Sequence, residues 1–500
     1  MVVRSAKKAS PGQLGLDIPG TGTASEVQVP DGYTGLARFH KYWGKKPAEI
    51  STFLTQALTE PGDLVLDPFV GSGVSALPVV MAGRRLLAVD LNPTAAELTR
   101  MLLSPPSPRS LDEALLHLGR SVAEPIRESY RLVDGRNATH YLWNGDSLQA
   151  VWVVNGRKRE EFVPTEHDTS LARSFASCQA STLRPLQLFD NARINATTAI
   201  GWSDLFTGRA LSNIDLIVEQ LRVAPEETRV PLLLVLTSCI GQMSNMVFAI
   251  SGRGKTRGAA APDKIEVGSW VIGYWRPELH FEVNVWQVFE RRLKRLAKTL
   301  RSVPAVDLHR HGDIGSLVRA TSGYLVLNAD SLEVLSGIPA DSVSLIVTDP
   351  PHGDRIPYCE LSEIWNAVLD ESPDFSAEVV VSNARGRNKD SSSYNASISQ
   401  FFQEAARVLK PRGFLGFMFN SRRPEDWLEI KTDAATTDGQ LVYIGRFPAE
   451  YSANSVVQDN RSGAMKSDHV LIFQRCHLSG NAGAPPSLTC VPGWTEEPPA

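Results

Sequence analysis

The sequence predicts an α/β fold in which one nucleotide-type sheet is interrupted by a large, mainly helical insertion. Strand-like and helix-like patterns alternate from residue 35 to about 103, and this alternation returns from Tyr324 onward. Helical periodicity dominates the block between them. We therefore expect the first and last segments to form a single sheet.

Composition indicates a folded chain. Hydrophobic residues make up 42% of the 500 residues, with 18 Phe, 10 Trp and 10 Tyr, which excludes a mainly disordered protein. Lys and Arg number 51 against 55 Asp and Glu, so the net charge is −4. Binding of nucleic acid would therefore require a local basic surface.

Cysteine usage and hydropathy predict a soluble, cytoplasmic protein with no membrane contact. The 5 cysteines form no C-x-x-C pair, which disfavours both a disulfide scaffold and a zinc site, and we expect no metal. The N-terminus lacks the apolar region of a secretory signal. Polar residues interrupt the most apolar stretch, Val230 to Ile250, which predicts a buried helix.

The chain is expected to divide into five parts. Segments rich in Gly, Ser and Pro at 1–30 and 478–500 predict disordered tails. Residues 31–108 and 321–477 are expected to form the two halves of the sheet, and residues 109–320 the insertion.

The first half begins with the apolar strand L-V-L-D, which ends in a glycine turn at Asp67 to Gly73. A helix closed by Gly83 follows, and a second buried strand ends in Asp90. Helices open the insertion as far as about Leu132. The sequence V-W-V-V-N-G-R-K-R-E-E-F-V then predicts a hairpin that turns at Asn155-Gly156.

A helix from Val285 carries apolar residues on one face and Arg or Lys over most of the rest. In the last segment, Y-L-V-L-N-A-D-S, V-S-L-I-V-T-D-P-P and F-L-G-F-M-F-N read as strands. S-I-S-Q-F-F-Q-E-A-A-R-V-L-K reads as a helix, and Q-L-V-Y-I-G-R-F with D-H-V-L-I-F-Q-R completes the sheet edge.

The turn Asp67-Pro68-Phe69-Val70-Gly71-Ser72-Gly73 lies where an open α/β sheet binds its ligand, between a buried strand and a helix. Its glycines let the backbone approach a ligand, and Asp67 can accept from an ammonium group. A P-loop is excluded because no Gly-Lys-Ser/Thr follows. Asp90, at the tip of the next strand, is placed to hold ribose hydroxyls.

A second turn, Asp349-Pro350-Pro351-His352, follows the apolar strand V-S-L-I-V-T. Two prolines fix a rigid bend that exposes the Asp349 carboxylate and the Pro350 carbonyl at the sheet edge. Two adjacent acceptors can take both hydrogens of an exocyclic NH₂ group and localise the nitrogen lone pair on an incoming methyl group.

These two turns resemble those of the S-adenosylmethionine-dependent amino methyltransferases, the N6-adenine and N4-cytosine DNA methylases. F-H-K-Y-W-G-K-K-P, from Phe39, is similar to the family's upstream cofactor motif. N-A-D-S-L-E-V-L matches the strand whose terminal acid, here Asp330, faces the cofactor's adenine. The resemblance covers about residues 35–103 and 321–475.

The resemblance implies a Rossmann-like methyltransferase sheet, S-adenosylmethionine as cofactor and double-stranded DNA as substrate, with the insertion as candidate target-recognition region. Asp before Pro-Pro favours adenine N6, flipped out of the duplex for direct in-line transfer without a metal. The implied cofactor-binding residues are His40, Trp43, Lys45, Asp67, Pro68, Phe69, Gly71, Gly73, Asp90 and Asp330. The implied catalytic residues are Asp349, Pro350, Pro351 and His352.

His352 departs from the family pattern, because an aromatic Tyr, Phe or Trp usually follows D-P-P and stacks on the flipped base. A non-catalytic nucleic-acid-binding relative is therefore one alternative. An RNA base-amine methyltransferase is another, although such enzymes usually carry a separate N-terminal RNA-binding domain.

Basic residues on two loops and one helix are candidate phosphate contacts, against the alternative that they are solvated surface. They are Arg253, Lys255, Arg257, Arg291, Arg295, Arg385 and Arg387. The recognition sequence, a partner restriction or defence protein and the oligomeric state stay open at this level.

Overall fold

The computed structural model describes residues 35–156, 158–251, 255–256, 259–260, 265–271, 273–303, 308–353, 356–420, 430, 434, 437–450, 467–476 and 483–497. Seven strands form one sheet in the order β11-β2-β1-β12-β13-β15-β14. Both predicted α/β segments contribute to it, which confirms a single interrupted sheet. The strands are β1 (Leu64–Asp67), β2 (Arg85–Asp90), β11 (Tyr324–Asn328), β12 (Val343–Thr348), β13 (Leu409–Phe419), β14 (Leu441–Glu450) and β15 (Ser467–Arg475).

The central strands are buried on both faces because helices cover each side of the sheet. Leu64 and Leu66 of β1 belong to a core that includes Phe401 of α15, whereas Val65 belongs to the opposite core with Ile50 and Leu54 of α1. The covering helices are α1 (Ala48–Leu58), α2 (Ala76–Met81), α3 (Pro93–Leu103), α11 (Ile314–Arg319), α12 (Ser331–Gly337) and α15 (Ser391–Val408).

The strand order reverses at β1, with β2 on one side of it and β12 on the other, both parallel to it. A crevice at the carboxyl ends of the strands is expected at such a reversal. β15 alone runs antiparallel to its neighbours β13 and β14. The last strand in the chain therefore begins at the edge where β12 and β13 end.

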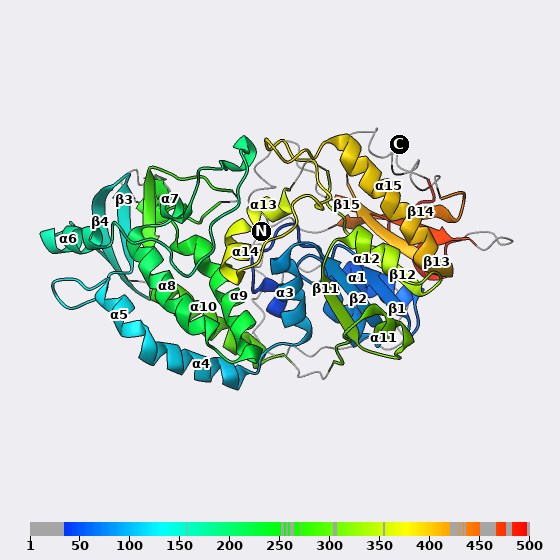
Figure 1. Cartoon of the computed structure of the whole chain (residues 1–500), viewed down its shortest axis with the longest axis horizontal. Helices are drawn as coiled ribbons and strands as arrows, with labels where there is room; N and C mark the ends of the chain where they lie inside the picture. Colours follow the sequence, from blue (N-terminus) through cyan, green and yellow to red (C-terminus); the bar gives the residue numbers. More distant parts are fainter. Residues whose placement is uncertain are drawn as a thin grey trace, which may run out of the picture.

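The insertion forms a second lobe beside the sheet, to the left in Figure 1. It contains a four-stranded sheet of order β10-β3-β4-β5 and several helices. The helices are α4 (Pro108–Ser121), α5 (Ala123–Glu128), α6 (Glu166–Ser174), α7 (Trp202–Leu205), α8 (Gly208–Arg222), α9 (Glu226–Ile240) and α10 (Val285–Leu300), with 3₁₀ turns η2 (Ala192–Ile194) and η3 (Gly241–Met243). The strands are β3 (His140–Asn144), β4 (Ser147–Asn155), β5 (Lys158–Phe162) and β10 (Leu279–Val283), with short strands β6 (Ala249–Ser251), β7 (Lys255–Thr256), β8 (Ala259–Ala260) and β9 (Ile265–Val267).

Local predictions for the insertion are confirmed with small shifts. The hairpin forms between β4 and β5, but Asn155 still pairs with Lys158, so the turn starts one residue later than predicted. α10 buries Phe289 and Leu293 and exposes Arg291 and Arg295, as its amphipathic pattern requires. α9 is buried through its apolar run, and among the described residues no helix is long and apolar enough to cross a membrane.

The two lobes share one interface, which is made by helices from both halves of the chain. α13 (Tyr358–Leu361) and α14 (Glu363–Leu369) follow the second proline-containing turn, yet α14 packs against α9 of the insertion and α3 of the sheet. The turn η1 (Gly35–Arg38) packs against α10. These contacts bring the segment before α1 close to the end of β12.

The C-terminal segment differs from the expected disordered tail over residues 483–497. It contains α18 (Pro486–Thr489), and Thr495 pairs with Arg446 of β14. The Trp494 ring lies where a side chain at Gly445 would otherwise extend. One large aromatic ring anchors this Pro- and Gly-rich segment, which the composition of the segment did not indicate. The predicted tail at 1–30 lies outside the described residues.

Candidate active site

One pocket lies at the carboxyl ends of β1, β2 and β12, at the reversal in strand order. The segment before α1, the first turn of α12 and the region around α13 complete its walls. Among the residues predicted to be functional, those that line it are Trp43, Lys45, Asp67, Phe69, Gly71, Asp90, Asp330, Asp349 and Pro351. The structure thus brings part of each predicted turn to one cavity, whereas Pro350, which is buried, and His352 do not line it.

Asp67 ends β1 and lines the pocket. One oxygen accepts from the Phe69 amide at 3.2 Å and the other from the Ser75 hydroxyl at 2.8 Å. Burial raises the pKa of Asp67 to about 7 in spite of these hydrogen bonds. A cationic ligand group would stabilise the ionised form of this carboxylate.

Asp90 ends β2 and ties the glycine turn to the neighbouring strand. Its carboxylate accepts from the Gly71 amide at 2.7 Å and from the Asn92 amide at 2.8 Å. Burial raises the pKa of Asp90 to about 6. Asp330 has a similar place at the start of α12, where it caps the helix by accepting from the Leu332 amide at 2.9 Å.

The two glycines of the turn have different tasks. Gly71 lines the pocket at a φ of +56°, where any side chain is strained. Gly73 does not line it; a Cβ there would lie 2.6 Å from the Thr99 hydroxyl, so this glycine allows α3 to pack closely. Pro68 also lies outside the lining, and its carbonyl accepts from the Ser331 hydroxyl. The turn therefore supplies the pocket through Asp67, Phe69 and Gly71.

The aromatic segment before α1 contributes unequally. Trp43 lines the pocket and stacks on Trp365 with ring centroids 4.9 Å apart. The Lys45 ammonium donates to the Ala37 and His40 carbonyls, and burial lowers its pKa to about 8.

His40 is not at the pocket, contrary to its predicted place. Its ring is buried beside Trp365 and shares a hydrogen bond of 3.1 Å with the Thr237 hydroxyl of α9. Burial lowers the pKa of His40 well below its usual value, so the ring is neutral. We assign it to the interface between the lobes.

Asp349 follows β12 directly and lines the same pocket as the glycine turn. Its Oδ2 is 3.4 Å from the Lys46 ammonium, and its Oδ1 is 3.0 Å from Nε2 of His352. Pro351 lines the pocket, and its carbonyl accepts from the Tyr394 hydroxyl at 2.7 Å. The His352 ring packs against Phe419, with 9% of its side chain exposed. His352 therefore lies beside the Asp349 carboxylate in this structure.

Sequence reasoning missed Lys46, Glu378 and Asp468. Lys46 and Glu378 line the pocket, and Asp468 is the partner of Lys46. Lys46 stands within the quoted aromatic motif, directly before Pro47 and α1, and this position is the signal that could have found it. Asp468 and Glu378 carry no local motif.

The predicted phosphate contacts have different exposures. Arg291 and Arg295 are exposed on α10, and Arg385 is exposed on its loop. Arg387 is a correction: it is buried between Glu378 and Glu360, so its guanidinium is not available to phosphate. Arg253 and Arg257 lie outside the described residues, and only the backbone of Lys255 is described, in β7.

Comparison with known proteins agrees with this geometry. Residues 22–101, which contain the aromatic segment, the glycine turn and Asp90, match the model of a family described as DNA methylase. A type II methyltransferase of Streptococcus pneumoniae, M2.DpnII, is 33% identical over 82 residues. These matches confirm the resemblance to the N6-adenine/N4-cytosine DNA methyltransferase family. The alignment with M2.DpnII covers 15% of this chain and 31% of that methylase.

Solved structures give weaker matches. A protein from Thermus thermophilus described as a DNA modification methylase is 15% identical, with 32% of this chain and 55% of that chain covered and a TM-score of 0.19. A protein from Listeria monocytogenes described as a class I S-adenosylmethionine-dependent methyltransferase is 14% identical over 39% of this chain and 43% of that chain, also with a TM-score of 0.19. Likenesses of this size carry no argument about the site.

Proposed function

We propose that this protein transfers a methyl group from S-adenosylmethionine to the exocyclic amine of a base in double-stranded DNA, adenine N6 in preference to cytosine N4. The observation that carries the proposal is the shared pocket: the family's cofactor turn and the Asp349 turn line one cavity at the reversal in strand order. The pneumococcal relative, a type II methyltransferase, supports methyl transfer, and the family model described as DNA methylase supports DNA as the substrate.

The residues of the pocket fit this cofactor. Asp67 and Asp90 are buried carboxylates with raised pKa values, as expected of sites that take up an ammonium group and ribose hydroxyls. Gly71 leaves its side of the pocket open to a ligand, and Phe69 and Trp43 offer apolar surface. When bound, the cofactor supplies an electrophilic methyl group on a sulfonium sulfur.

The chain's own chemistry lies in Asp349 and the Pro350 carbonyl. They accept the two hydrogens of the target amine, so the nitrogen lone pair is directed at the methyl group instead of being delocalised into the ring. The nitrogen would gain a bond to the methyl carbon as the carbon–sulfur bond breaks, with its electron pair left on a neutral thioether sulfur, and it would lose a proton to the Asp349 carboxylate. Positioning and preorganised acceptors account for the rate, and no covalent enzyme intermediate is formed.

The target base must leave the duplex to reach Asp349, because that carboxylate lies at the inner wall of the pocket, with 17% of its side chain exposed. The His352 ring, which packs against Phe419, lies next to the Asp349 carboxylate. Asp before Pro-Pro, by family analogy, favours adenine.

Transfer of an isotope-labelled methyl group from S-adenosylmethionine to duplex DNA, with tRNA as the competing substrate, tests the proposal. We expect label in DNA, recovered after hydrolysis as N6-methyladenine. Label in N4-methylcytosine would correct the base, and label in tRNA alone would replace DNA with RNA as substrate. Tight duplex binding without any label would identify a non-catalytic relative.

A further inference from the structure

A lysine lies between two carboxylates at the edge of the sheet. The Lys46 ammonium contacts Oδ2 of Asp349 at 3.4 Å and also forms a close ion pair with Oδ2 of Asp468. The exposed fractions of the three side chains are 15% for Lys46, 17% for Asp349 and 3% for Asp468. Charges this far from solvent interact more strongly than surface pairs do.

Asp468 is itself fixed by the sheet. It is the second residue of β15, and its Oδ1 accepts at 2.8 Å from the side-chain amide of Asn420, which directly follows the neighbouring strand β13. The antiparallel register pairs Phe419 with His469, and this pairing brings the next residues, Asn420 and Asp468, side by side. Asp468 is therefore a rigid anchor for the Lys46 ammonium.

This arrangement makes the two oxygens of Asp349 different. Oδ2 faces Lys46, whereas Oδ1 is buried and has no hydrogen bond from any described residue, although Nε2 of His352 lies 3.0 Å away. A buried carboxylate oxygen without a donor is costly unless a ligand supplies one.

We propose that Lys46 is a positioning residue for Asp349: anchored by Asp468, it holds Oδ2 and leaves Oδ1 as the acceptor for an N–H of the target amine. This inference rests on the proposed function, because it assigns the task of a residue next to the proposed acceptor. His352 covers Oδ1 in the absence of a base and is displaced when the amine arrives.

A divalent cation is the alternative occupant of the same place, since ligand atoms of Asp349, His352 and Asp468 all lie within 4.8 Å of one another. The Lys46 ammonium already contacts two of these three groups, so an added cation would meet a like charge at short range. The two alternatives therefore predict different effects of a chelator. Activity that needs a bound metal would be lost, whereas activity that depends on Lys46 would be kept.

The test compares Lys46→Ala and Lys46→Arg with Lys41→Ala as matched control. Lys41 belongs to the same segment, but its side chain is exposed and its ammonium lies over the Trp270 ring at 4.9 Å from the centroid. Initial rates over a range of DNA concentrations give kcat and KM, and calorimetry gives the affinity for S-adenosylmethionine.

We expect Lys46→Ala to lower kcat by about 10²-fold, the size of effect produced by misplacing a reacting group by about 1 Å. KM for DNA and cofactor affinity should change far less. Lys46→Arg should recover part of kcat, and added propylammonium should recover part of the activity of Lys46→Ala. A lysine with only a structural role would show no such chemical rescue. Lys41→Ala should match the wild type.

Unchanged kcat in a folded Lys46→Ala variant, with an active wild type, would overturn the inference and leave the proposed function intact. A wild type that methylates no nucleic acid would overturn both. If Lys46→Ala does not fold, Asp468→Asn decides: a lower kcat supports the inference, and wild-type kcat refutes it. Activity lost with a chelator and restored by Mg²⁺ or Mn²⁺ would assign the cluster to a metal instead.

Discussion

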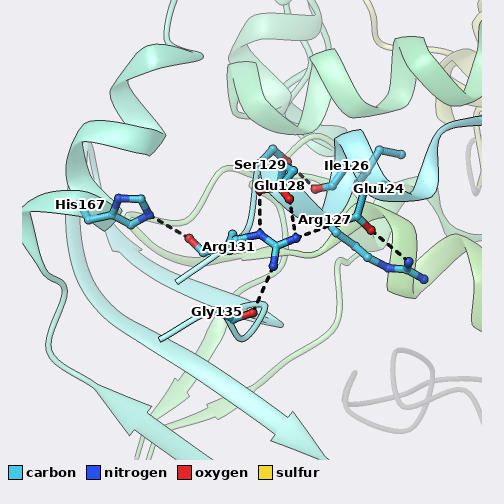
Figure 2. Close-up of polar contacts among 8 residues, drawn as sticks. All are labelled: Glu124, Ile126, Arg127, Glu128, Ser129, Arg131, Gly135 and His167. Carbon is cyan, nitrogen blue, oxygen red and sulfur yellow. Dashed lines mark hydrogen bonds and ion pairs between the residues drawn. The ribbon is translucent and has the colours of Figure 1, made fainter. Parts of the chain in front are cut away.

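Two clusters of charged side chains differ in their exposure to solvent. One lies on the surface of the insertion, and the other is largely buried at the edge of the sheet. Figure 2 shows the surface cluster, in which Arg131 donates to Glu124, Glu128 and the Gly135 carbonyl. The exposed fractions there are 35% for Arg131, 60% for Glu124 and 55% for Glu128. Around Lys46 they are 3–17%. Burial, more than the number of ion pairs, distinguishes the cluster that can direct chemistry.

The two clusters also differ in how far apart their members lie in the sequence. Glu124 and Glu128 belong to the short helix α5, and Arg131 follows its end closely. Lys46 and Asp468 are 422 positions apart and meet only because the sheet brings β12, β13 and β15 to one edge. The first cluster is a product of local structure, and the second exists only in the complete fold.

The largest effect is expected at the buried cluster. Asp349→Ala removes one acceptor of the target amine and should lower the methylation rate by about 10²–10³-fold. Cofactor affinity, measured by calorimetry, should stay near the wild-type value because the glycine turn is untouched. A wild-type rate on duplex DNA would show that Asp349 is not the acceptor.

We expect cofactor binding to depend on the glycine turn that lines the same pocket as Asp349. Gly71→Val puts a β-branched residue at a φ of +56°, with a strain of about 1–3 kcal/mol, and fills space beside the ligand. The strain lowers folding stability in the free and the bound protein alike. Because the added side chain takes up space where the cofactor would approach the backbone, affinity for S-adenosylmethionine should fall about tenfold or more, as measured by calorimetry.

Gly145→Val is the matched control, since Gly145 has a φ of +52° in the β3–β4 turn of the insertion, with open space around it. Similar strain there should leave cofactor affinity unchanged. Equal losses in the two variants would mean that global destabilisation, and not the pocket, explains the effect.

Cofactor affinity should depend on pH through Asp67. Because burial raises the pKa of Asp67 to about 7, the free protein holds a proton there that an ammonium ligand must displace. Affinity should therefore rise with pH by up to about tenfold per unit below pH 7 and level off above it, in calorimetric titrations. Asp67→Asn should remove most of this dependence.

Through Asp67, the free energy of unfolding should change with pH in the opposite direction to cofactor affinity. The unfolded chain ionises Asp67 near pH 4. Between about pH 4 and 7 the folded protein binds more protons at this group, so the contribution of Asp67 to the free energy of unfolding declines as pH rises. Urea unfolding without cofactor should show this decline in the wild type and a smaller one in Asp67→Asn.

The smallest effect is expected on the insertion surface. Replacing exposed Arg291 and Arg295 of α10 with Met should weaken binding of all duplex sequences alike, and should reduce the salt slope of log affinity by about two if both contact phosphate. Fluorescence anisotropy at several salt concentrations measures the slope.

Arg131→Met serves as the control in the same lobe, because Glu124 and Glu128 already neutralise Arg131. Its DNA affinity, salt slope and melting temperature should match the wild type. If Arg131→Met changed the salt slope of log affinity as much as the α10 variant does, the result would contradict a specific contact between α10 and phosphate.

Sequence reasoning found the site residues that lie at the end of a strand or in the turn directly after it. Asp67 and Asp90 are the last residues of apolar strands and Asp349 directly follows one, and the carboxyl ends of parallel strands lie at one edge of the sheet. It could not find Asp468, whose partner Lys46 comes from the other end of the chain. It also misplaced His40 and Arg387, because Thr237, Glu360 and Glu378 decide their environment and no local pattern joins them.

The reversed direction of β15 has a consequence for the order in which the protein becomes competent during synthesis. The cofactor turn and Asp349 leave the ribosome well before Asp468, which stands at the start of the last strand of the sheet. Until that strand inserts between β13 and β14, Lys46 lacks its ion pair with Asp468, and under our proposal Asp349 lacks the orientation that this pair gives it. A nascent chain that stops before β15 would hold both family motifs and still lack an organised catalytic edge.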